Sequence, residues 1–273
     1  MRRWPVLALL VFLPACRTHP TVIEPQHAAY DVQAFAERVR AGDVDVIDLT
    51  IRLDGKTPYF PGGESFALVP AANLDKDGYY ANHFAMGEHT GTHIDAPCHF
   101  AKGRWSVDDI PLSHVVASCC VVDVTAQVAK DPDYAVCVRD FELWEASHGR
   151  IPDGAVVVMR SGWGSRAGDL ETYRNADSAG VLHFPGFSRE ASEWLVRERT
   201  IVGVGVDTLS GDPGPSKDYG THHVLNGADK YILENLANVD KLPEAGAVLV
   251  VSPLPIRGGS GSPVRVYALV GKR

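Results

Sequence analysis

The residues with the clearest chemistry lie in one window, from His89 to His99. It holds three histidines and one aspartate, His89, His93, Asp95 and His99, at offsets of 0, 4, 6 and 10. Imidazole nitrogens and a carboxylate oxygen are ligands that suit zinc, manganese or iron(II). Only 11 of the 273 residues are histidine. A cluster this dense seldom arises by chance, so the window indicates a metal site.

The spacing of this window also constrains its shape. All four offsets are even, so an extended segment would place the four side chains on one face. A fully extended run of this length spans ~33 Å, which is too long for a single site. The segment must therefore bend, and Gly91 and Pro97 are residues that permit or impose bends.

A second group of polar residues lies near the C-terminus. His222 is followed twelve positions later by Glu234, which comes directly after Tyr231, Ile232 and Leu233. A glutamate after such an apolar run is costly to bury without a cation or hydrogen bonds. Alone this pair is weak evidence for a metal site, but beside the first window it supports one.

These motifs resemble those of a known family. The window reads His-x-Gly-Thr-His-x-Asp-x-Pro-x-His, which resembles the signature of the cyclase-like metal-dependent hydrolases, of the kynurenine formamidase and isatin hydrolase type. The similarity continues through most of residues 44–270. It takes in the segments Thr57–Gly62, His183–Phe187 and Gly205–Ser210 and the spacing from His222 to Glu234.

The resemblance implies roles for particular residues. His89, His93 and Asp95 would hold metal, and His222 and Glu234 would complete the site. The ions would be zinc or manganese, one or two in number. His99 would transfer protons. The family fold is a swivelling β/β/α domain, usually assembled as a homodimer or a higher homo-oligomer.

The implied reaction is hydrolysis of an amide or cyclic amide, at a C–N bond other than a peptide bond. The substrate would be a small molecule of the arylformamidase or the isatin hydrolase type. Phe60 stands where the formamidase has a tryptophan, so the specific formylkynurenine contact is not implied. Phe60, Tyr59 and Ser210 are the candidate substrate residues; core packing is the alternative role for the two aromatic side chains, and a turn is the alternative for Ser210. Asp207 could order the site or simply form a turn.

Two other functions are alternatives to this one. A non-catalytic envelope lipoprotein that binds metal or ligand would keep the same ligands without a reactive His99. A serine hydrolase has little support, because Ser161-Gly162-Trp163-Gly164 lacks the Gly-x-Ser-x-Gly elbow.

Composition narrows the class of protein. Apolar residues make up 45% of the chain and charged residues 22%, which is typical of a globular domain. The net charge of -8 argues against a nucleic-acid binder that relies on phosphate contacts. Beyond the N-terminus, no window approaches the ~20 apolar residues of a membrane span.

The N-terminus resembles an export signal. Arg2 and Arg3 precede an apolar run, Trp4–Leu13, and Ala15 is followed by Cys16. This layout predicts a lipoprotein signal peptide over residues 1–15, with lipid on Cys16 and a tether over residues 16–29. The protein would then be anchored in the cell envelope, on the periplasmic side of a bacterial membrane. A plain secretory signal is the alternative.

Residues 30–273 are expected to form the single mixed α/β domain that positions these side chains. Periodicity predicts helices over Asp31–Arg40 and Ser188–Arg199, the second capped by Ser188. Strands are predicted over the segments Val44–Leu53, Cys119–Val124, Ala155–Met159, Ile201–Val206, Ala247–Val251 and Val264–Val270, the last two flanking a turn at Gly258–Ser262.

The four cysteines of the domain are Cys98, Cys119, Cys120 and Cys137. A disulfide among them is possible in an exported protein, and burial as small apolar residues is the alternative. On a strand, Cys119 and Cys120 would point to opposite faces, so at most one is expected in the core.

Overall fold

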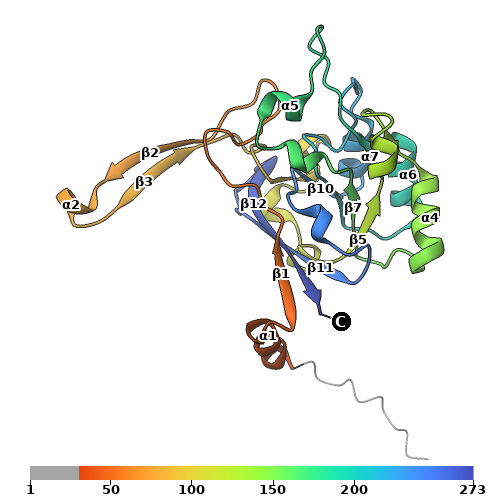
Figure 1. The fold of residues 1–273 in the computed structure, drawn as a ribbon, viewed down its shortest axis with the longest axis horizontal. Helices are drawn as coiled ribbons and strands as arrows, with labels where there is room; N and C mark the ends of the chain where they lie inside the picture. Colours follow the sequence, from red (N-terminus) through yellow and green to blue (C-terminus); the bar gives the residue numbers. More distant parts are fainter. Residues whose placement is uncertain (1–30, 273) are drawn as a thin grey trace, which may run out of the picture.

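The computed structural model describes residues 31–272, and a sheet of eight strands forms the centre of its fold (Figure 1). The strand order is β1-β12-β11-β5-β7-β9-β10-β4. Since β12 also pairs with β4, all the strands except β1 close into a barrel. The strands are β1 (Val44–Asp48), β4 (His93–Asp95), β5 (Val116–Asp123), β7 (Val156–Arg160), β9 (Gly203–Val206), β10 (Tyr231–Glu234), β11 (Ala247–Pro253) and β12 (Gly261–Gly271).

Helices cover one side of this barrel. Strands β5, β7, β9 and β10 run parallel, and helices lie between them in the chain: α4 (Val138–His148), α6 (Arg189–Glu198) and α7 (Gly220–Gly227). Figure 1 shows these three helices gathered on the same side of the sheet. The shorter helices are α3 (Thr125–Val128) and α5 (Leu170–Arg174), and β6 (Ala135–Val136) pairs with β8 (Gly186–Phe187). The expected single mixed α/β domain is confirmed.

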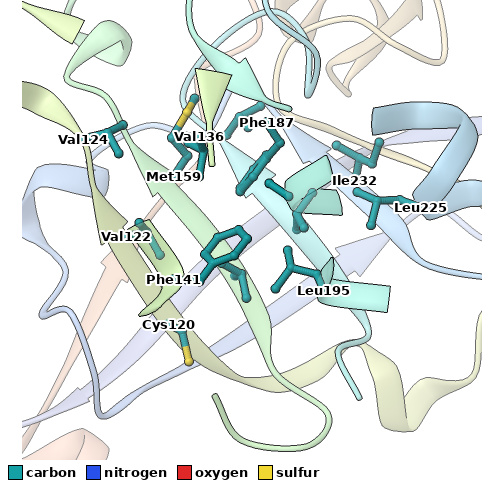
Figure 2. Close-up of a cluster of buried hydrophobic side chains, with 14 of the residues drawn as sticks. Cys120, Val122, Val124, Val136, Phe141, Met159, Phe187, Leu195, Leu225 and Ile232 are labelled. Atoms are coloured by element: carbon teal, nitrogen blue, oxygen red, sulfur yellow. The ribbon is translucent and has the colours of Figure 1, made fainter. Parts of the chain in front are cut away.

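Two apolar cores explain the composition of the central strands. One lies between the sheet and the helices, where Figure 2 shows Cys120, Phe141 and Leu195 packed together. The other fills the barrel and contains Cys119. The prediction that only one of these neighbouring cysteines faces a core is wrong, because both faces of β5 are covered. Cys98, Cys119, Cys120 and Cys137 are all free thiols, so no disulfide links them.

Most of the predicted elements are present. Helix α6 is capped by Ser188, whose Oγ accepts from the amide of Ala191 (3.1 Å). Helix α1 (Val32–Ala41) runs one residue beyond the predicted end at Arg40, and Gly42 is its C-cap. The strand predicted over Val44–Leu53 is shorter and stops at Asp48. It stops there because the hydroxyl of Thr50, instead of its backbone, pairs with Val266 of β12.

A hairpin arm, defined by β2 (Ala67–Ala72) and β3 (Ala81–Ala85), was not predicted. It carries the short helix α2 (Leu74–Asp77) at its tip and projects away from the barrel (Figure 1). Its side chains are largely exposed, including Leu68 and Phe84, which pair across the two strands. Within the described residues, no helix has the length and apolar character needed to cross a membrane.

Candidate metal centre

Strand pairing brings the two polar clusters of the sequence together. Strand β10 lies antiparallel to β4, with Glu234 directly opposite His93. Directly opposed residues point to the same face of a sheet, and Asp95 shares that face because it lies two positions beyond His93. The Nε2 atom of His93 is 3.2 Å from Asp95 Oδ1 and 3.3 Å from Glu234 Oε2. All three side chains are buried.

Helix α7 adds His222 to this group. Its Nε2 atom is 3.0 Å from Asp95 Oδ2 and 3.3 Å from Glu234 Oε1. The amide of Gly211 donates to the same Oε1 atom of Glu234 (2.8 Å). The two carboxylates are therefore held between His93 and His222.

His89 reaches the same carboxylates through the predicted bend. Gly91 has φ +68, and a Cβ atom there would lie 2.8 Å from Thr57 Cγ2, so only glycine fits this turn. The turn directs His89 Nδ1 to within 2.6 Å of Asp95 Oδ1. Pro97 makes the second bend, at the start of the turn Pro97–His99. The structure thus brings together all five predicted ligands.

Hydrogen bonds decide which nitrogen of each buried imidazole faces the carboxylates. His93 Nδ1 is 2.9 Å from the carbonyl of Gly91, which can only accept. His222 Nδ1 is 2.5 Å from Asp212 Oδ2, whose carboxylate accepts. In each neutral ring, the Nδ1 atom therefore carries the hydrogen and Nε2 presents a lone pair. His93 Nε2 is buried and has no hydrogen-bond partner.

This donor set fits a divalent metal. Lone pairs of two imidazoles and two carboxylates converge on one buried point, where without a cation they would repel one another. Among the protein groups alone, burial lowers the pKa of His93, but Asp95 and Glu234 outweigh burial and raise this pKa to about 10. Burial likewise raises the pKa of Asp95, but the neighbouring histidines hold it well below its usual range. The site therefore stabilises positive charge beside its carboxylates.

His99 lies next to this group. Its ring stacks on His89 with the centroids 4.1 Å apart, and its centroid is 6.0 Å from that of His222. Burial is the main reason that its pKa falls to about 4. Donor atoms of His89, Asp95 and His99 lie within 4.8 Å of one another. This geometry suits proton transfer at the site and also suits a metal ligand.

A cavity of about 220 Å³ opens onto these side chains. Besides the histidines and carboxylates, its lining consists of Phe60, Phe100, Leu209, Ser210 and Tyr219. Two of the three candidate substrate residues, Phe60 and Ser210, therefore line this cavity. Tyr59 lies outside the lining, because its ring packs against the guanidinium group of Arg174, 4.7 Å from the ring centroid.

Several residues around the site could not be identified from the sequence. Phe100, Leu209 and Tyr219 carry no motif that separates them from core residues. Asp212, which orients His222, sits in a Gly-Asp-Pro segment that is typical of a turn. Asp207 accepts hydrogen bonds from Ser161 and Gly164, so it stabilises the loop after β7.

The barrel and this buried donor set define a metal-dependent hydrolase. The family model described as "Putative cyclase" matches residues 47–213. The chain belongs to this cyclase family.

Individual relatives cover nearly all of the domain. The chain is 36% identical to isatin hydrolase of Roseibium aggregatum, over 88% of this chain and 97% of that protein. It is 28% identical to kynurenine formamidase of Bordetella petrii, over 80% of this chain and 94% of the relative. The structure of isatin hydrolase A from Ralstonia solanacearum superposes with a TM-score of 0.82 at 38% identity, over 94% of this chain and 100% of that one.

Proposed function

We propose that this protein is a metal-dependent hydrolase that opens the C–N bond of a small aromatic cyclic amide of the isatin type. The observation that carries the proposal is the convergence of five ligand side chains, from β4, β10, α7 and the turn before β4, at the base of an apolar cavity. N-formyl aryl amines are the second substrate class, since kynurenine formamidase is also a relative.

Sequence similarity and the lining of the cavity favour the cyclic amide. The match to isatin hydrolase takes in more of this chain, at higher identity, than the match to kynurenine formamidase. The cavity wall is formed by Phe60, Phe100, Leu209 and Tyr219, which suit a planar aromatic ring.

Zinc or manganese, as one or two ions, would be held by His89, His93, Asp95, His222 and Glu234. When bound, such a metal lowers the pKa of water toward ~7 and polarises a carbonyl oxygen. In the reaction, water attacks the carbonyl carbon, the C–O bond forms and the C–N bond breaks. His99 accepts one proton of the water and delivers it to the nitrogen of the broken bond, which becomes the amine of the ring-opened product.

The test is a substrate screen on purified, metal-loaded protein. Isatin, a set of cyclic amides and an N-formyl aryl amine are incubated with the loaded protein and with protein stripped by a chelator. Turnover of the cyclic amides that requires metal supports the proposal. Preference for the formyl amide would move the protein to the second class. Tight metal binding without turnover of any amide would instead favour the non-catalytic binding protein.

We also propose that the protein is exported, that Cys16 is its lipid anchor and that it assembles as a homodimer or higher homo-oligomer. Residues 1–30 lie outside the described part of the chain, so the support for export is the basic, apolar and small-residue pattern before Cys16. The support for assembly is the exposed apolar hairpin arm.

A further inference from the structure

We propose that Glu88 and Ser260 form a positioning pair that fixes which nitrogen of His89 faces the metal. The Oγ atom of Ser260 is 2.6 Å from Glu88 Oε2 and 3.0 Å from His89 Nε2. The inference rests on the proposed function, because it concerns a ligand of the proposed metal. It adds two residues that do not themselves reach the metal.

The direction of the hydrogen bonds follows from what surrounds Glu88. Its Oε2 atom also accepts the backbone N–H of Ser260 (3.1 Å), so this oxygen is an acceptor. A serine hydroxyl has one hydrogen, and the short contact to Glu88 uses it. Toward His89, the Ser260 oxygen can then only accept. The hydrogen of the His89 ring therefore sits on Nε2, and the lone pair on Nδ1 points at the site, 2.6 Å from Asp95 Oδ1.

The same logic holds for the other two imidazoles of the site. His93 donates the hydrogen on its Nδ1 atom to the carbonyl of Gly91, and His222 donates its Nδ1 hydrogen to Asp212. Those two partners can only accept. Ser260 differs from them, because a hydroxyl can also donate, and it becomes a fixed acceptor only while Glu88 takes its hydrogen.

The backbone holds this pair rigidly beside the ring. The carbonyl of Ser260 accepts from the amide of Ala96 (2.9 Å), which ties it to the end of β4. The next residue, Gly261, packs closely against the ring, since a Cβ atom there would lie 2.5 Å from His89 Cε1. The close contact with Gly261 therefore limits where the imidazole can lie, and the hydrogen bond with Ser260 orients it.

The test measures zinc affinity by titration calorimetry on metal-free wild-type and variant proteins. Removing the partner of a ligand histidine typically weakens metal binding about 10- to 100-fold. We expect Ser260→Ala and Glu88→Met to weaken zinc binding by that factor. Ser260→Thr keeps the hydroxyl and Glu88→Gln keeps an acceptor oxygen, so both should stay near wild type. Ser252→Ala is the control, an exposed serine on β11.

A second measurement reads the ring directly. In the zinc-loaded wild-type protein, ¹⁵N spectra of the imidazoles should show His89 with hydrogen on Nε2 and zinc on Nδ1. Zinc on Nε2 would overturn the proposal, and this measurement stands even if Ser260→Ala fails to fold.

The two proposals fail in different ways. Wild-type protein that binds no metal would refute the proposed function. If the wild-type protein binds zinc and the zinc affinities of Ser260→Ala and Glu88→Met lie within two-fold of the wild-type affinity, only the positioning pair is refuted. Equal weakening in Glu88→Gln and Glu88→Met would also refute it, because the acceptor oxygen would then be irrelevant.

Discussion

Glu234 lies directly opposite His93 in the pair of β10 and β4, with Glu234 Oε2 3.3 Å from His93 Nε2. The pairing joins two polar clusters that are far apart in the sequence, and it places both residues on a shared buried face. A carboxylate and an imidazole held this way by backbone hydrogen bonds form a rigid base for a metal.

Metal content should depend on Asp95 more than on any other carboxylate of the fold. Asp95 contacts His89, His93 and His222, so Asp95→Asn removes negative charge from the centre of the site. We expect purified Asp95→Asn to retain little metal by elemental analysis. Asp207→Asn is the matched control, because Asp207 is a buried aspartate that bonds Ser161 and lies outside the cavity lining. Full metal content in Asp95→Asn would refute the ligand assignment.

Acid stability should depend on one ion pair between α4 and the end of α6. Glu145 accepts from Arg199 Nε (2.6 Å) and from the amide of Ile151 (2.9 Å). The hydrogen bond from Arg199 is the main reason that the pKa of Glu145 lies below its usual value. A lowered pKa in the folded state stabilises the protein above the unfolded pKa, and this stability is lost as pH falls through the folded pKa.

Glu145→Gln should therefore lower the free energy of unfolding at pH 7 by about 1 to 3 kcal/mol, as expected for hydrogen bonds to a charged group. The difference from wild type should shrink as the pH falls below the usual carboxyl range near 4.5. Urea unfolding at a series of pH values measures both quantities. A difference that stays constant with pH would show that the charge of Glu145 is irrelevant.

The hairpin arm should mediate assembly. An isolated two-stranded hairpin is marginally stable in water, and the paired residues Leu68 and Phe84 are 55% and 60% exposed. We expect wild-type protein to be a dimer or larger in light scattering, and the double variant Leu68→Asp, Phe84→Asp to shift toward monomer. Leu112→Asp is the control, since Leu112 is 83% exposed at another site. An unchanged mass in the double variant would exclude the arm from the interface.

Lipid on Cys16 can be tested in a bacterial host. Wild-type protein should incorporate labelled palmitate and fractionate with membranes, and Cys16→Ser should do neither, because it lacks the thiol that is acylated. Cys98→Ser, which leaves Cys16 in place, controls for the loss of a cysteine. Equal labelling of wild type and Cys16→Ser would refute the lipid anchor and favour the alternative, a plain secretory signal.

The sequence indicated which side chains come together at the site better than it indicated how the strands are arranged. The bends at Gly91 and Pro97 were predictable because glycine and proline determine backbone shape locally. Closure of the barrel was not, because β4 is only three residues long and its partners on β10 and β12 lie far along the chain. The orienting roles of Asp212 and Ser260 were not predictable for the same reason. Each acts through a partner in another segment, and neither has a spacing that marks it.

The catalytic role of His99 gives the sharpest test of the reaction. His99 stacks on His89 within the cavity lining, and general acid-base groups typically contribute ~10² to 10⁴ in rate. His99→Ala should lower turnover of a cyclic amide by that factor while metal content stays near wild type. The loss should be smaller for an ester, because an alcohol departs with less need of a proton than an amine does. His83→Ala, an exposed histidine on the hairpin arm, is the control for loss of an imidazole. Loss of metal together with activity would make His99 a ligand, and unchanged turnover would remove it from the mechanism.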